Sequence, residues 1–277
     1  TGRRPPAKSS HGLACRSVRT LIDFDDAPVI AVPTAAGPRY AVLVEGPQGW
    51  GEFSPPPDAD DALAARWLTA AMEPSTVGWP DAVRGRVPVD DGARRLSVAA
   101  GDVDAAVARI GDLRAGAIEV VLLECRDPAD ARSVRHRVDV PIAVDAALLL
   151  ADPQCADIAI LRCGPSGGVR RAMRRAERLD LPALVDFTGT TSIGLAADVA
   201  LAAALPQLPF ACGPVPGWLA DADVVSEARS LIPRDGHLPA APMPAGPDPV
   251  RLQRFAVTDA ETVAHWRALL RRAAAML

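Results

Sequence analysis

The chain has 277 residues, of which 49% are hydrophobic and 23% are charged, and its formal net charge is −4. These values are typical of a globular protein with a sizeable core, and they offer no electrostatic basis for binding nucleic acid. No uncharged apolar run is long enough to cross a bilayer. We therefore expect no membrane partner and a cytoplasmic location.

The cysteines and the lysine limit the possible chemistry. Five cysteines are widely spaced without a C-x-x-C pair, which argues against a disulfide framework and a structural zinc site. The single lysine, Lys8, lies in the polar segment 1–20, which we expect to be a mobile tail. The predicted folded part therefore has no lysine for Schiff-base or proton-transfer chemistry.

Residues 21–86 predict a small α+β domain. Apolar runs at 21–32 and 39–44 favour two strands, and a turn at 45–49 follows the second. Segment 58–72 places Leu63, Trp67 and Ala70 on one helical face, with aspartates at its start as candidate N-caps. We expect strands followed by one helix.

Strands and helices alternate between residues 87 and 213. Helices are predicted at 102–113, 128–137, 167–179 and 192–205. Short apolar runs, typical of strands buried on both faces of a parallel sheet, lie at 87–89, 96–100, 118–123, 138–145, 156–162, 181–186 and 208–213. This order predicts a parallel barrel or a doubly wound sheet. Residues 214–277 predict a short helix at 224–231, a hairpin turn at 234–238 and a closing helix at 260–277.

Charged residues end three of the predicted strands, namely Asp145, Arg162 and Asp186. In both folds the chemistry takes place at the carboxyl ends of the strands, so these three are the candidate catalytic residues. Arg162 cannot be a base, because a guanidinium does not lose its proton in a protein, but it can bind a substrate carboxylate. The alternative is a purely structural ion pair between Asp145 and Arg162.

Hydroxyl side chains and glycines follow two of these strand ends. The loop after Asp186, with Thr188, Thr190, Thr191 and Ser192, precedes a helix, so it can present N–H groups to an anionic substrate or simply cap that helix. The loop 164–168 is a second possible carboxylate cradle, or only a strand-to-helix turn. Both alternatives stay open for each loop.

Several strings resemble a known family when they are taken together in order. They are Gly49-Trp-Gly-Glu-Phe-Ser54, Val140-Pro-Ile-Ala-Val-Asp145, Ala156-Asp-Ile-Ala-Ile-Leu-Arg162, Gly167-Gly-Val169, Thr191-Ser-Ile-Gly-Leu195 and Ala211-Cys-Gly213. This series resembles the actinobacterial o-succinylbenzoate synthases of the enolase superfamily. The resemblance implies an N-terminal α+β capping domain over a modified (β/α) barrel. It also implies that Glu52 and Ser54 face the barrel mouth as candidate substrate contacts, with a turn as the alternative.

The family's reaction is a Mg²⁺-assisted dehydration of a cyclohexadiene carboxylate, and this chain departs from the residues it requires. The family's Lys-x-Lys motif is absent, and its second lysine falls on Arg162. At the metal-ligand positions stand Asp145, Leu122 and a residue near Ser97. One carboxylate does not hold Mg²⁺. We therefore expect no metal and no cofactor.

The segment from 87 to 213 has about 127 residues, against roughly 200 or more for eight βα units. At least one βα unit is therefore missing. We predict an α/β fold with a truncated barrel at 87–213, a capping domain at 21–86 and a C-terminal segment at 214–277.

Two functions from different classes remain open. In the first, the chain is a repurposed enzyme of specialised metabolism, performing lyase, isomerase or cyclase chemistry without a metal. Arg162 would anchor a small anionic substrate, and Asp145 or Asp186 would act as acid or base. In the second, it is a catalytically silent binding or partner protein, whose opened barrel exposes strand edges that a homo-oligomer could cover. The retained polar strand ends favour the enzyme slightly.

Overall fold

The computed structural model describes residues 22, 24–90, 95–113 and 118–277. The predicted tail at 1–20, with Lys8, lies outside the described residues. In the described part no helix is both long and apolar enough to cross a membrane.

The first unit is an antiparallel sheet covered by a helix. Strands β1 (Val29–Val32), β2 (Arg39–Gly46) and β3 (Gly49–Phe53) pair in the order β1-β2-β3. Helix α1 (Asp61–Thr76) begins at Asp60, whose carboxylate accepts from the Leu63 N–H at 2.7 Å. Within the predicted strand at 21–32, the described residues form a strand from Val29 to Val32. The α+β capping domain is thus present.

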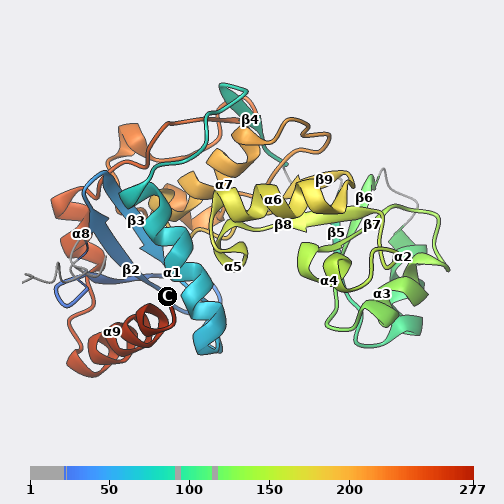
Figure 1. Ribbon diagram of the computed structural model, residues 1–277, viewed down its shortest axis with the longest axis horizontal. Coiled ribbons are helices and arrows are strands. Elements are labelled where there is room, and N and C mark those ends of the chain that lie inside the picture. The colour runs from blue at the N-terminus through green and yellow to red at the C-terminus, as the bar shows by residue number, and fades with distance from the viewer. Residues whose placement is uncertain (1–21, 23, 91–94, 114–117) are drawn as a thin grey trace, which may run out of the picture.

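Both ends of the described chain contribute to this unit. Helices α8 (Pro249–Phe255) and α9 (Ala260–Ala275) lie beside the β1–β3 sheet and α1 (Figure 1). Trp266 and Leu270 of α9 belong to one buried cluster with Phe53 and Leu68. The predicted closing helix therefore completes the core of the capping domain.

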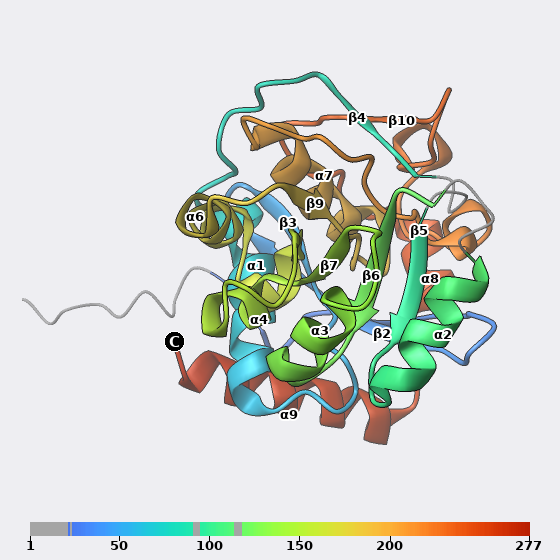
Figure 2. The same ribbon diagram turned by 90° about the vertical axis from the view of Figure 1, so that its right-hand side faces the viewer.

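The second unit is a curved parallel sheet of five strands in chain order. These are β5 (Arg95–Ala99), β6 (Val120–Glu124), β7 (Ile142–Asp145), β8 (Ile158–Leu161) and β9 (Ala183–Val185). Helices α2 (Val103–Leu113), α3 (Pro128–Arg135), α4 (Ala146–Ala151) and α6 (Val169–Leu179) surround its outer face (Figure 2). The one-turn helix α5 (Cys163–Ser166) precedes α6, and α7 (Ser192–Ala204) follows β9. This arrangement is the truncated (β/α) barrel that the sequence predicts.

Both faces of the sheet are buried, which explains the apolar runs without alternation. Val121, Val144 and Leu161 point outward into the cluster that contains the helices. Leu122, together with neighbours on β7, β8 and β9, points inward into a separate, smaller cluster. A single strand therefore presents apolar side chains to two different cores.

Two predicted barrel strands are absent from this sheet. Strand β4 (Arg86–Pro88) pairs instead with β10 (His237–Pro239) in an antiparallel ribbon. Segment 208–213 forms only an isolated bridge from Cys212 to Val89. Prolines in both segments remove the N–H donors that a regular ladder requires, so the pairing stays short.

The loops and short helices differ in detail from the prediction. The predicted helix at 224–231 is only a 3-10 turn, Glu227–Arg229, because two adjacent β-branched valines disfavour a helix there. The hairpin turn at 234–238 is confirmed by the bond from the Arg234 N–H to the His237 carbonyl at 2.9 Å. Helices α4 and α5 were not predicted. Each begins within two residues of the end of a strand and is too short for a helical period to show in the sequence.

Candidate functional site

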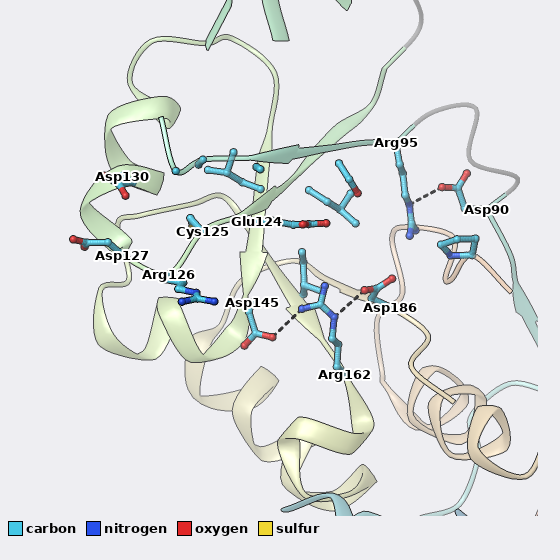
Figure 3. Close-up of a pocket in the computed structure, with 18 residues that line it drawn as sticks. Asp90, Arg95, Glu124, Cys125, Arg126, Asp127, Asp130, Asp145, Arg162 and Asp186 are labelled. Atoms are coloured by element: carbon cyan, nitrogen blue, oxygen red, sulfur yellow. Dashed lines mark hydrogen bonds and ion pairs between the residues drawn. The ribbon is translucent and has the colours of Figure 1, made fainter. Parts of the chain in front are cut away.

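The three candidate catalytic residues lie together at the carboxyl ends of neighbouring strands. Arg162 donates from Nε to Asp186 at 2.8 Å and from Nη1 to Asp145 at 3.1 Å (Figure 3). Their side chains are between 18% and 33% exposed. The predicted pair of Asp145 and Arg162 is therefore part of a three-residue array that opens toward solvent.

The backbone fixes the array. Asp145 ends β7 and caps α4, where its Oδ1 accepts from the Ala147 N–H at 2.9 Å. Arg162 follows β8 and holds an extended conformation at the start of α5. Parallel pairing places Asp145 opposite Ile160, two residues before Arg162. The side chains meet because adjacent parallel strands end at the same edge.

The two aspartates of the array keep Arg162 charged. Burial by itself lowers the pKa of Arg162, but the negative charges of Asp186 and Asp145 outweigh it and hold that pKa above its ordinary value. Arg162 therefore stays protonated. Its remaining N–H groups can donate to a ligand.

A cavity of about 790 Å³ opens above the array. It lies at the carboxyl edge of the sheet, and Ser97, Leu122 and Glu124 contribute to its wall along with the array. Sequence reasoning missed Glu124 as a site residue, although it ends β6 as Asp145 ends β7. Four consecutive strands, β6 to β9, thus end with or are followed by a charged side chain.

A buried ion pair forms the far wall of this cavity. Arg95 Nε lies 2.9 Å from Asp90 Oδ2, and both side chains are less than one-tenth exposed. Arg95 Nη1 also donates to the Gly213 carbonyl at 3.0 Å. These contacts join β5 to Asp90, which precedes it, and to Gly213, which follows β9.

The predicted substrate contacts in the capping domain lie elsewhere. Glu52 is buried and accepts from the N–H groups of Thr190 at 2.7 Å and Thr191 at 2.9 Å. It also accepts from the hydroxyls of Thr191 and Ser54, each at 2.6 Å. None of these four residues lines the 790 Å³ cavity. Glu52 instead joins the capping domain to the N-terminus of α7.

The other two predicted residues, Thr188 and Ser192, also bond inside the protein. Ser192 donates to Asp223, which is fully buried. Thr188 donates its N–H to Asp198 at 2.7 Å. The structure therefore separates Thr188, Thr190, Thr191 and Ser192 from the array. Thr191 caps α7 by accepting from the Ile193 N–H at 3.1 Å, as the capping alternative predicts.

Asp198 is a buried carboxylate that sequence reasoning missed. It accepts from the N–H groups of Cys163 at 3.1 Å, Thr188 at 2.7 Å and Gly189 at 3.1 Å. Burial raises its pKa to about 7, although these bonds favour the charged form. Its signal in the sequence is a single charge in an otherwise apolar helix. It links the segments that follow β8 and β9 behind the array.

The glycine loop at 164–168 is occupied by a side chain of the capping domain. Glu73 of α1 accepts from the Val169 N–H at 2.6 Å and pairs with Arg170 at 3.0 Å. A Cβ atom on Gly168 would lie 2.3 Å from Glu73 Oε2. The predicted carboxylate cradle thus holds a carboxylate of the chain itself.

The residues at the family's metal-ligand positions do not fit Mg²⁺. In the described part no three of the His, Cys, Asp and Glu side chains gather where they could hold a metal ion. Leu122 points into an apolar cluster, and both oxygens of Asp145 accept hydrogen bonds within the protein. Mg²⁺ requires near-octahedral oxygen ligands. The donor set is therefore incomplete.

Comparisons with known proteins agree with this scaffold. Residues 37–75 match the enolase N-terminal domain-like family. The o-succinylbenzoate synthase of Thermobifida fusca (strain YX) is 34% identical, and the match covers 86% of this chain and 90% of that protein. The o-succinylbenzoate synthase of Mycobacterium leprae (strain TN) is 30% identical, and the match covers 80% of this chain and 82% of that protein. The chain belongs to the o-succinylbenzoate synthase family.

Membership of the o-succinylbenzoate synthase family confirms the resemblance seen in the sequence. The alignment with the Thermobifida protein is 295 positions long, which exceeds the 277 residues of the chain. The relative therefore contains segments that have no counterpart here. This agrees with a barrel that has lost part of its wall.

Solved structures support the fold. A 2-chloromuconate cycloisomerase from Rhodococcus opacus 1CP has a TM-score of 0.64 at 17% identity, covering 85% of this chain and 98% of that one. An enolase from Mycobacterium smegmatis (strain MC2 155), complexed with tartrate, has a TM-score of 0.65 at 15% identity, covering 85% and 90%. At these identities the likeness concerns the fold alone.

Proposed function

We propose that this member of the o-succinylbenzoate synthase family is an isomerase, lyase or cyclase that acts on a small carboxylate without a metal ion. The observation that carries the proposal is the array of Asp145, Arg162 and Asp186 beneath a cavity at the strand ends. In this superfamily fold, substrates bind at that edge of the barrel.

Arg162 is the substrate anchor in this proposal. Two of its five N–H donors bond to Asp186 and Asp145. The others have no partner among the described residues and can bind a carboxylate. The two aspartates also hold the guanidinium plane in one orientation. A fixed donor geometry lowers the entropic cost of binding the substrate.

Asp186 and Asp145 act as proton acceptors. Each carboxylate accepts a hydrogen bond from Arg162, and a carboxylate placed beside a substrate C–H can act as a general base. In an isomerisation, the base takes a proton from one carbon of the substrate and returns it to another. Such a reaction needs no external acid and no net change in protons.

Exchange of substrate protons with the solvent tests this function even when the product is unidentified. Small carboxylates, including the family's cyclohexadiene carboxylate, are incubated with the full chain in D₂O containing EDTA. Proton NMR should show enzyme-dependent exchange of a C–H for deuterium in at least one compound. Arg162→Met and Asp186→Asn should each reduce the rate about a hundredfold or more. Exchange that requires Mg²⁺, or that persists in Arg162→Met, overturns the proposal.

A second candidate function is binding without catalysis. It is favoured by the ion pairing of both carboxylates beside Arg162 and by the position of β5 at an edge of the parallel sheet. An edge strand can pair with another chain, including a second copy. Light scattering that shows a stable dimer, together with no exchange for any carboxylate, would support this alternative.

A further inference from the structure

The cavity above the array has an excess of negative charge. Its lining includes three guanidinium groups and twice as many carboxylates, those of Asp90, Glu124, Asp127, Asp130, Asp145 and Asp186. The guanidinium groups belong to Arg95, Arg126 and Arg162. A ligand that carried only negative charge would be repelled by this surplus. The proposed function therefore leaves the charge of the cavity unexplained.

Internal pairing accounts for half of these carboxylates. Asp90 is neutralised by Arg95, and Asp145 and Asp186 share Arg162. Of the other three, Asp127 caps α3 by accepting from the Ala129 N–H at 2.8 Å. Glu124 takes part in no ion pair or side-chain hydrogen bond within the described part of the chain.

Glu124 is well placed to meet a ligand. It is the last residue of β6, and its backbone carbonyl accepts from the Ala100 N–H at 2.9 Å. Figure 3 shows its carboxylate projecting toward the space between Arg162 and Arg95, whereas Asp127 and Asp130 lie on the opposite side. The backbone is thus fixed while the side chain remains free to bond.

Resting on the proposed function, we propose that the substrate is zwitterionic: its carboxylate binds Arg162 and its ammonium group binds Glu124. Small amino acids are the chemical class that has both charges. An ammonium group supplies three donors to an acceptor-only carboxylate. A ligand of this kind satisfies the free donors of Arg162 and the free acceptor at the end of β6 together. It adds no net charge to a cavity that already has a negative surplus.

Matched pairs of simple compounds test this proposal. Glycine, β-alanine, 4-aminobutyrate and 6-aminohexanoate vary the distance between the charges. Acetate, propionate, butyrate and hexanoate have the same chains without the amine. Calorimetric titration of the full chain should show that at least one amino acid binds about tenfold or more tightly than its matched carboxylate. Succinate, which has two negative charges, should bind more weakly than that amino acid.

Variants separate this proposal from the proposed function. Glu124→Gln should remove the tenfold preference while leaving carboxylate binding in place. Glu177→Gln makes the same change at an exposed position of α6 and should preserve the preference. Arg162→Met should abolish binding of both series, and carboxylate binding unaffected by this variant overturns the proposed function.

Four results overturn the zwitterion proposal. A preference that survives in Glu124→Gln overturns this inference alone, as does tighter binding of succinate than of every amino acid. Absence of binding by every probe overturns both proposals. Titration with MgCl₂ alone tests whether a divalent cation occupies the site instead. If the chain binds Mg²⁺ and Glu124→Gln abolishes that binding, the partner of Glu124 is a metal ion and not an ammonium group, and the inference is overturned.

Discussion

Arg162 donates from Nε to Asp186 Oδ2 at 2.8 Å, and this bond joins the ends of β8 and β9. Asp145, at the end of β7, binds the other side of the same guanidinium. One cation thus connects three strand ends at the mouth of a barrel that has lost part of its wall. The array is therefore both the candidate site of chemistry and a structural connection.

Arg162→Met should destabilise the protein by about 1–2 kcal/mol, because Asp145 and Asp186 would face each other without a cation. Urea unfolding measures the change. If unpaired carboxylates cause it, Asp186→Asn should restore part of the lost stability when added to Arg162→Met. Asp186→Asn alone, with Arg162 still present, should lower the free energy of unfolding. Equal stability of Arg162→Met and the parent chain would contradict this account.

Glu52 should prove essential to the contact between the capping domain and α7. Glu52→Ala leaves the buried N–H groups of Thr190 and Thr191 without an acceptor, so we expect a loss of about 3 kcal/mol or more. Glu45→Ala is the matched control on an exposed end of β2, with a change within about 0.5 kcal/mol. Similar effects of the two substitutions in urea unfolding would refute the role given to Glu52.

Gly164 should tolerate no side chain. A Cβ atom there would lie 2.5 Å from the ring of Trp67 in α1, so Gly164→Ala should destabilise the chain by about 1–3 kcal/mol. Gly111 lies inside α2, and among the described residues no atom apart from its chain neighbours and its own helix backbone would lie within 4 Å of an added Cβ. Gly111→Ala should instead stabilise by about 0.5–1 kcal/mol. Thermal unfolding of the two variants should move in opposite directions.

Asp198 should make stability depend on pH. Burial raises its pKa to about 7, against about 3.9 in an unfolded chain. The folded state therefore holds this proton more tightly, and the stabilisation is fully present below about pH 4 and is lost as the pH rises to 7. Between about pH 4 and pH 7, the free energy of unfolding of the parent chain should fall by up to about 1.4 kcal/mol per pH unit relative to that of Asp198→Asn. Urea unfolding at several pH values that shows a constant difference would rule this out.

Magnesium should have no effect on the thermal stability of the chain. A bound ion raises the melting temperature in proportion to the logarithm of its concentration, but the ligand positions of the family hold Leu122 and the internally hydrogen-bonded carboxylate of Asp145. Melting in MgCl₂ and in EDTA should therefore coincide. A rise of several degrees in MgCl₂ would show that other oxygens complete a site.

The sequence by itself determined the order of the five parallel strands and of the longer helices, the ancestry and the residues of the array. Short apolar runs identify parallel strands because both faces of such a sheet are buried. Charged residues at the ends of these runs identify Asp145, Arg162 and Asp186, since parallel strands end at one edge. The absence of the family's lysines and the leucine at a ligand position can also be seen in the sequence alone.

Only the tertiary structure decided which polar residues face the cavity and which hold the protein together. Glu52 and Glu73 come from the capping domain, yet their partners lie at the N-termini of α7 and α6. Pairing between residues so distant in sequence depends on how the two units pack, and no local pattern encodes it. The free carboxylate of Glu124 became apparent for the same reason. Its neighbours had to be placed in space before it could be seen that no described residue pairs with it.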